Sequence, residues 1–155
     1  MKNLIFSHYY LSLIIFLRFI LKIKSIPYNS TLEIVAQFNI IEFRINSSLK
    51  VKCEKCRPAG IKLSKNGTIF CSFPRWYDDM NVTFAKYNKE ENAFEPWPNL
   101  EMNQRYTSGK SSGLNSILGF EIDNDDNLYI LDQGRINKNP ALNNSMKLLN
   151  YSLKD

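Results

Sequence analysis

Histidine is almost absent from this sequence, with one in 155 residues, and cysteine is scarce, with three. The single histidine, His8, lies in an apolar stretch at the N-terminus. A chain cleaved after that stretch would contain none, which excludes a Ser-His-Asp triad, a Cys-His pair and a histidine-ligated zinc site from residues 26–155. We therefore expect no cofactor.

The excess of positive charge is smaller than the whole chain suggests. The net charge is +5, from 20 basic and 15 acidic residues. Residues 1–25 hold four of the bases and no acid, so the rest of the chain has 16 bases (20 − 4) against 15 acids, a net charge of +1. A basic surface for nucleic acid needs a clustered excess of Lys and Arg. No nucleic-acid partner is expected.

Residues 1–25 form an apolar leader. Lys2 is followed by the apolar run Leu4–Leu21, which predicts a secretory signal peptide with cleavage near Ser25. The alternative is an uncleaved membrane anchor, because Arg18 interrupts the run and two lysines follow it. Contact with a membrane is expected only if the leader is retained.

Glycosylation sequons support passage through the secretory pathway. Chance predicts about two Asn-x-Ser/Thr triplets in a chain of this composition, whereas the sequence holds six. The candidate acceptors are Asn29, Asn46, Asn66, Asn81, Asn143 and Asn150. The protein is therefore expected to be a secreted, extracellular glycoprotein.

The three cysteines, Cys53, Cys56 and Cys71, predict a disulfide rather than a metal site. Structural zinc takes four ligands, and the mature chain offers three thiols and no histidine. Disulfides persist in the oxidising secretory compartment. An odd number leaves one thiol free, in an intermolecular bond, or paired outside this chain, so the pairing stays open.

One pattern of apolar and turn-forming residues occurs twice, near 60–75 and near 119–135. In each copy, two short apolar runs flank a cluster of turn formers, which predicts a tight β-hairpin. An offset of 59 residues (119 − 60) superposes polar turn on polar turn and apolar strand on apolar strand. It pairs Gly60 with Gly119, Leu63 with Ile122, Ser64 with Asp123, Asn66 with Asp125, Ile69 with Leu128 and Phe70 with Tyr129. A repeat of this length built of strands and turns indicates propeller blades.

The rest of the chain completes the predicted blades. The first hairpin (strands near 60–64 and 68–73) is followed by strands near 80–87 and 94–97, which make one four-stranded blade. The second hairpin is followed by a third strand near 146–153. Before the first blade, 32–45 is expected to form a strand or a short amphipathic helix, and 46–57 a loop.

The predicted fold is therefore all-β: an incomplete β-propeller of about two blades, spanning residues 26–155. Two blades do not close a ring, because the smallest propellers have about four. We expect the chain to be part of a longer polypeptide, or to be covered at its open edge by another molecule. The isolated chain is expected to aggregate through that edge.

Three segments resemble the Yellow/major royal jelly protein family. Phe73–Trp76 (Phe-Pro-Arg-Trp), the strand 81–87 and Pro96–Pro98 are similar to the order Pro-Arg-Trp, strand, Pro-Tyr-Pro in that family's first blade. Leu128–Ile136 resembles the family's Leu-Trp-Val-Leu-Asp-x-Gly-Arg-Ile, and Met146–Leu153 resembles the strand that follows it. The resemblance covers about residues 57–155.

The resemblance implies a six-bladed secreted propeller, of which this chain would be the N-terminal third. Members of the family differ in function: some convert dopachrome, some bind biogenic amines and some serve as nutrients. The leading hypothesis is a non-catalytic protein that binds a small aromatic amine, such as a biogenic amine, in the propeller channel. A dopachrome-converting or lactonase-like enzyme is the alternative, as is a fragment without function. Fold alone does not decide between them.

Two groups of polar residues are candidate sites. The acidic cluster Asp123–Asn127 lacks the glycine and glutamate that an EF-hand loop needs at its sixth and twelfth positions, so it predicts a hairpin turn and no metal site. The candidate ligand-binding residues lie at the ends of equivalent hairpin strands: Arg75, Trp76, Asp132 and Arg135. Trp76 would offer a stacking face and Asp132 a counter-ion for an amine. A structural ion pair of Arg75 or Arg135 with Asp132 is the alternative.

Overall fold

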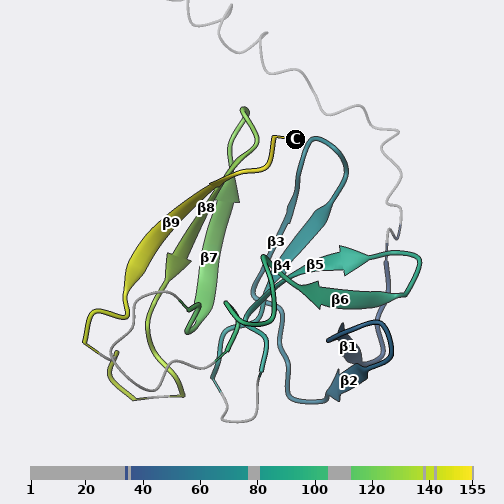
Figure 1. Ribbon diagram of the computed structural model, residues 1–155, viewed down its shortest axis with the longest axis horizontal. Helices are drawn as coiled ribbons and strands as arrows, with labels where there is room; N and C mark the ends of the chain where they lie inside the picture. Colours follow the sequence, from purple (N-terminus) through teal and green to yellow (C-terminus); the bar gives the residue numbers. More distant parts are fainter. Residues whose placement is uncertain are drawn as a thin grey trace, which may run out of the picture. The chain divides into compact units, whose positions relative to one another are not determined.

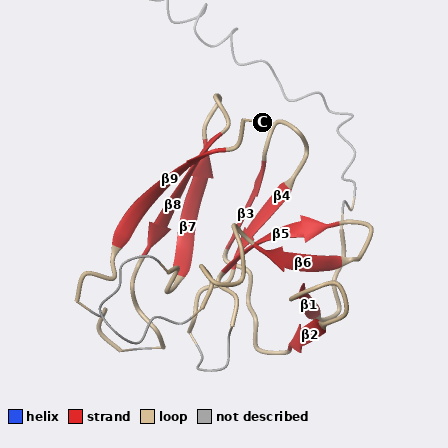
Figure 2. Ribbon diagram, viewed as in Figure 1, coloured by secondary structure: helices blue, strands red, loops and turns tan. Residues whose placement is uncertain are grey.

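The computed structural model describes residues 34, 36–76, 81–104, 113–137, 139–141 and 143–154. The chain divides into two compact units, Met1–Gln37 and Phe38–Asp155, and the strands of the described residues all lie in the second. These residues form two β-sheets and no helix (Figure 2), which confirms the predicted all-β class.

The first sheet has the strand order β2-β1-β6-β5-β4-β3. Its strands are β1 (Ile41–Arg44), β2 (Lys50–Cys53), β3 (Gly60–Leu63), β4 (Ile69–Ser72), β5 (Phe84–Asn88) and β6 (Ala93–Pro96). Strands β3, β4, β5 and β6 pair with one another in antiparallel fashion and form what we call the first meander. The β1–β2 hairpin extends this sheet through a short parallel pairing of Phe43 with Phe94.

The second sheet, here called the second meander, is antiparallel and has the order β7-β8-β9. Its strands are β7 (Ile117–Ile122), β8 (Asn127–Asp132) and β9 (Lys147–Ser152). Figure 1 shows it beside the first meander, with β7 next to β3 and β4.

The two predicted hairpins have the same register. In the first, Leu63 pairs with Ile69, and in the second Ile122 pairs with Leu128, each 59 residues later. The turns also match, because Gly67 and Asp126 occupy equivalent positions and both have positive φ, 86° and 60°. The repeat inferred from the sequence is therefore a repeat of backbone geometry.

The strand β2 corrects one expectation, since the sequence predicted a loop over 46–57. The side-chain Oδ1 of Asn46 accepts hydrogen bonds from the backbone N–H groups of Ser48 and Leu49, and this turn reverses the chain into β2. Most of β2 is exposed, so it lacks the apolar alternation that reveals a half-buried strand. Within the described part of 32–45, the strand is β1 alone.

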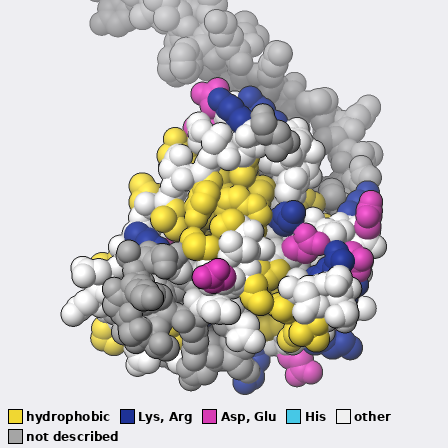
Figure 3. Space-filling view, in the orientation of Figure 1, with side chains coloured by type: hydrophobic (Ala, Val, Ile, Leu, Met, Phe, Trp, Pro, Cys, Tyr) yellow, Lys and Arg dark blue, Asp and Glu magenta, His cyan; other side chains and the backbone are white. Residues whose placement is uncertain are grey.

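Two apolar cores lie on opposite faces of the first meander, because neighbouring residues of a strand point to opposite sides. In the hairpin core, Phe43 of β1 packs against one face of the first meander. This core contains Phe43, Cys56, Cys71, Phe73, Val82, Ala85 and Phe94. The inter-sheet core lies between the two meanders and contains Phe70, Phe84, Leu114, Ile117, Leu128 and Ile130. In the space-filling view, apolar side chains gather where the two meanders meet (Figure 3).

The predicted leader, residues 1–25, and the sequon at Asn29 lie outside the described residues. Of the remaining candidate acceptors, each is exposed: Asn46, Asn66, Asn81, Asn143 and Asn150. A search of the described part of the chain finds no helix that is long and apolar enough to span a membrane.

Candidate functional site

Arg75 is fully buried where the first meander meets the second. Its backbone N–H donates to the Ser116 hydroxyl at 2.9 Å, just before β7. Its guanidinium donates to four main-chain carbonyl oxygens, those of Asn81, Asn103, Leu114 and Asn115. Arg75 therefore binds together three loop segments that the sequence places far apart.

Asp132, at the end of β8, is also fully buried. Its carboxylate accepts hydrogen bonds from the backbone N–H groups of Asn115, Ser116 and Gly134, at 2.7–2.9 Å, and forms an ion pair with Lys147 at 2.9 Å. Gly134 has a positive φ of 66°, and a Cβ there would lie 2.3 Å from the Ser145 hydroxyl oxygen. Only glycine fits this bend, which aims the Gly134 N–H at Asp132.

Asn103 completes this buried network from a loop whose polar sequence gave no sign of a core residue. Its side-chain oxygen accepts the backbone N–H groups of Thr83 and Phe84, and its amide nitrogen donates to the carbonyls of Trp97 and Asn99. The Thr83 hydroxyl then accepts the backbone N–H of Ile117 at 2.8 Å. Sequence reasoning missed Asn103, as it missed Ser116 and Lys147.

The structure brings together two of the four predicted site residues. Arg75 and Asp132 share Ser116 as a partner, and Asp132 takes Lys147 as its ion-pair partner instead of the expected Arg75 or Arg135. Trp76 is 43% exposed, and its backbone N–H donates to the carbonyl of Pro74. Arg135 is exposed and donates to the carbonyl of Asn139. Two of the four are thus structural and two face solvent.

Within the described residues, one buried acceptor in this network has no partner. The side-chain oxygen of Asn115, a residue only 1% exposed, accepts no hydrogen bond from the described residues. A buried acceptor left without a donor costs about 1–3 kcal/mol, so such an atom calls for a ligand or an ordered water. The backbone N–H of Asn115 donates to the Asp132 carboxylate at 2.7 Å.

The acidic cluster is a hydrogen-bonded turn, as predicted. Asp123 Oδ1 accepts hydrogen bonds from the backbone N–H groups of Asp125 and Asn127. The side-chain hydrogen bond from Asn127 is the largest cause that lowers the pKa of Asp123, and these two backbone bonds lower it further. Asp126 accepts the N–H of Lys65 in the turn of the first hairpin. Among the described residues, no cluster of three or more His, Cys, Asp or Glu could hold a metal ion.

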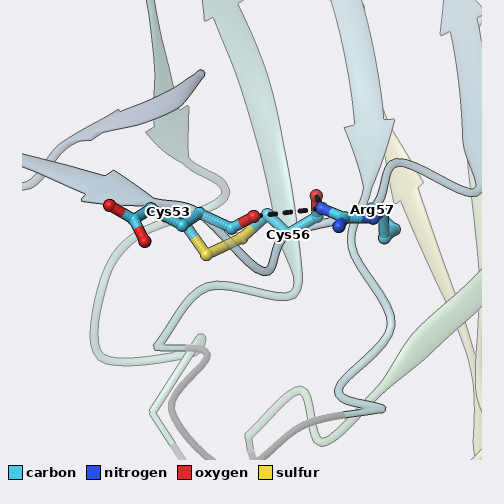
Figure 4. The surroundings of a disulfide bond; sticks show 4 residues. Cys53, Cys56 and Arg57 are labelled. Carbon is cyan, nitrogen blue, oxygen red and sulfur yellow. Dashed lines mark hydrogen bonds between the residues drawn. A yellow bond between two sulfur atoms is a disulfide. The ribbon is translucent and has the colours of Figure 1, made fainter. Parts of the chain in front are cut away.

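A disulfide joins Cys53, the last residue of β2, to Cys56 in the loop that follows (Figure 4), and Cys71 is a free, buried thiol. Burial raises the pKa of Cys71 to about 12, so this thiol stays protonated at neutral pH. Beside the disulfide lies a mostly apolar pocket of about 340 Å³. Its walls come from β1, β2 and the loops near 81 and 100, and they include Phe43, Val51, Val82 and Leu100.

The chain matches no model of a known protein family, and no curated protein matches it.

Proposed function

We propose that this chain forms two neighbouring blades of a secreted, Yellow/royal-jelly-like β-propeller that binds a small aromatic amine without catalysing a reaction. The support for a propeller is the pair of hairpins that share one register at an offset of 59 residues and pack face to face across the inter-sheet core. Blades of one propeller have this relation.

The observation that carries the binding role is the buried side-chain oxygen of Asn115, which accepts no hydrogen bond from the part of the chain that the structure describes. An ammonium or a hydroxyl group of a ligand would supply the missing donor. The exposed indole of Trp76 adjoins Arg75, whose guanidinium holds the carbonyl of Asn115. An aromatic amine could stack on such an indole and place its cation over the ring.

The geometry assigns structural roles to two of the candidate residues. Asp132 already holds Lys147, so the lysine ammonium occupies the position that a ligand ammonium would need. Arg75 holds carbonyl groups from three loops. The proposed contacts to ligand are therefore those of Trp76 and Asn115, with Arg135 at the exposed rim.

Isothermal titration calorimetry with serotonin and dopamine tests this proposal. We expect heat of binding with the intact chain, and its loss in Trp76→Ala and in Asn115→Ala. Asn115→Ala should change stability little, because relief of the unsatisfied oxygen offsets the packing that is lost with this buried side chain. Tyr129→Ala, a change at another exposed aromatic residue, is the matched control and should bind normally. Absence of amine binding overturns the proposal, and binding of calcium alone would favour a lactonase-like enzyme.

A further inference from the structure

The disulfide joins two cysteines of unequal exposure. Cys53 is half-buried at the end of β2, whereas Cys56 is 3% exposed and belongs to the hairpin core. Thiol–disulfide exchange begins when a thiolate attacks one sulfur of the bond, and its rate depends on access to that sulfur. A thiol of another molecule can therefore reach the bond at Cys53, while the hairpin core shields Cys56.

The spacing of this disulfide suits exchange better than cross-linking. The two cysteines are three residues apart in the sequence. A disulfide that closes so short a loop restricts the unfolded chain little, so it adds less stability than one that closes a long loop. The same Cys-x-x-Cys spacing keeps a second sulfur beside the first, where it can leave and return during exchange.

The turn that the disulfide closes carries an excess of positive charge. Lys52, Lys55 and Arg57 outnumber Glu54 in this segment, and Glu42 lies opposite Lys52 on β1, which leaves three bases against two acids. Arg57 folds back and donates to two main-chain carbonyls of the turn, both at 3.0 Å (Figure 4). Positive charge beside a cysteine favours the thiolate, which is the form that exchange releases.

Cys53 also lines the apolar pocket of about 340 Å³. Leu49 and Val51 in its wall are 46% and 37% exposed, and the pocket is also lined by buried Phe43 and Val82. Ligand pockets are commonly apolar hollows with a few polar or reactive groups in the wall. This pocket therefore offers an apolar side chain a place beside the disulfide.

The strand that ends at Cys53 lies at the edge of its sheet. In the described part of the chain, β2 pairs with β1 alone, so its other edge presents unpaired N–H and C=O groups. An extended peptide can bind to such an edge as an added strand. The edge, the pocket and the half-buried cysteine together fit a peptide segment that carries a thiol next to an apolar residue.

We propose that the Cys53–Cys56 bond oxidises a pair of thiols in an extended segment of another protein. A thiolate of that segment attacks Sγ of Cys53, the S–S bond breaks, and the Cys56 sulfur leaves with the electron pair and takes up a proton. The second thiolate then attacks the partner's own sulfur in the mixed disulfide and releases Cys53. Two electrons and two protons pass from the dithiol to this chain. The proposal depends neither on amine binding nor on a closed propeller.

The third cysteine gives an internal contrast. Cys71 is 2% exposed in the hairpin core, and burial raises its pKa to about 12, so it stays a protonated thiol. It is therefore expected to take no part in exchange. Cys71→Ala removes this thiol and gives a parent chain in which the disulfide is the only source of exchange.

The oxidised parent chain is first mixed with a reduced synthetic peptide that carries two cysteines and a leucine beside the first. Mass spectrometry should find one peptide disulfide formed for each chain reduced. The reaction should be at least about tenfold faster than that of the same peptide with oxidised glutathione at equal concentration. A rate no higher than that of oxidised glutathione would overturn the proposal.

Single-cysteine variants of the parent chain then identify the attacked sulfur. Cys56→Ala retains Cys53 and should capture the oxidised peptide as a mixed disulfide that persists, because no second thiol resolves it. Cys53→Ala retains the shielded Cys56 and should form the mixed disulfide at least about tenfold more slowly. Circular dichroism shows whether each variant folds, and Cys56→Val and Cys53→Val serve if an alanine variant does not. Equal rates, or a faster reaction at Cys56, would contradict the proposal.

A third pair of variants tests the pocket. Leu49→Asp places a charge in the wall beside Cys53 and should slow exchange with the leucine peptide severalfold. Ile61→Asp is the matched control, because Ile61 is an exposed apolar residue of the same sheet that does not line the pocket. It should react at the rate of the parent chain. Equal rates for the two variants would show that the pocket does not bind the peptide, and this part of the proposal would fail.

Discussion

The two meanders contain the same hairpin but differ in how much of it is covered. The first meander lies between two cores, with the β1–β2 hairpin on one face and the second meander on the other. The second meander has the inter-sheet core on one face and exposed Tyr129, Leu131 and Leu148 on the other. Turn conformation and strand register are therefore local properties of each hairpin, whereas the burial of a strand's side chains depends on which neighbouring element packs against them.

This comparison predicts that substitutions at equivalent positions have unequal effects. The largest difference is expected between Phe84→Ala and Leu148→Ala. Phe84 is fully buried against Phe120, so its loss should lower the free energy of unfolding by about 3–5 kcal/mol. Leu148 is 68% exposed, and its loss should change that value by less than about 0.5 kcal/mol.

Urea unfolding, at a concentration where the chain is monomeric, measures both variants. Similar losses at the two positions would show that Leu148 is covered within a single chain, contrary to its exposure in the structure.

A smaller difference is expected between two arginines. Arg75→Met leaves main-chain carbonyls near Asn103 and Leu114 without a donor, which should cost about 2–4 kcal/mol after the gain from burying methionine. Arg135 is exposed, so Arg135→Met should cost less than about 0.5 kcal/mol. Thermal unfolding by circular dichroism gives both values. If Arg135→Met proved the more damaging, the assignment of Arg75 as the structural residue would be wrong.

Two glycines give a third comparison. A Cβ at Gly60 would lie 3.0 Å from Phe120 and from the Ser72 hydroxyl, so Gly60→Ala should destabilise the inter-sheet contact by about 1–3 kcal/mol. At Gly119 the same methyl group meets no described atom, and Gly119→Ala should be neutral or stabilise by about 0.5 kcal/mol. The melting temperatures of the two variants measured side by side decide this, and equal shifts would contradict the unequal packing.

Much of the strand pattern could be predicted from the sequence, because apolar alternation and turn chemistry are local signals. The predicted strands near 60–64 and 94–97 correspond to β3 at 60–63 and β6 at 93–96. The strand β2 was missed because its side chains face solvent and carry no alternation. The propeller itself stays a prediction, since the described sheets number two and neither closes on itself.

The candidate site was predictable only in part. Its residue types and their places at strand ends could be inferred, and the structure puts Arg75 and Asp132 in one buried network. Their partners could not be inferred, because Asn103 and Lys147 come from other segments and no sequence pattern marks them. The pairing of Cys53 with Cys56 likewise needed the structure, since three cysteines allow three pairings.

The smallest expected effect concerns the ion pair between the equivalent residues Lys62 and Glu121. The hydrogen bond from Lys62 is the largest cause that lowers the pKa of Glu121 below its ordinary value of 4.5. A carboxyl whose pKa is lower in the folded state than in the unfolded one stabilises the fold above its ordinary pKa, and this contribution is lost as the pH falls through the lowered value. Because Glu121 is exposed, the contribution is small and salt-sensitive.

Stability curves from pH 7 down to acid should therefore differ between the intact chain and Glu121→Gln in one way: the variant is slightly less stable at neutral pH, and the two curves converge below pH 4.5. Lys62→Met should give the same convergence, because it removes the other half of the pair. Curves that stay parallel in acid would show that the pair does not join the two meanders in solution.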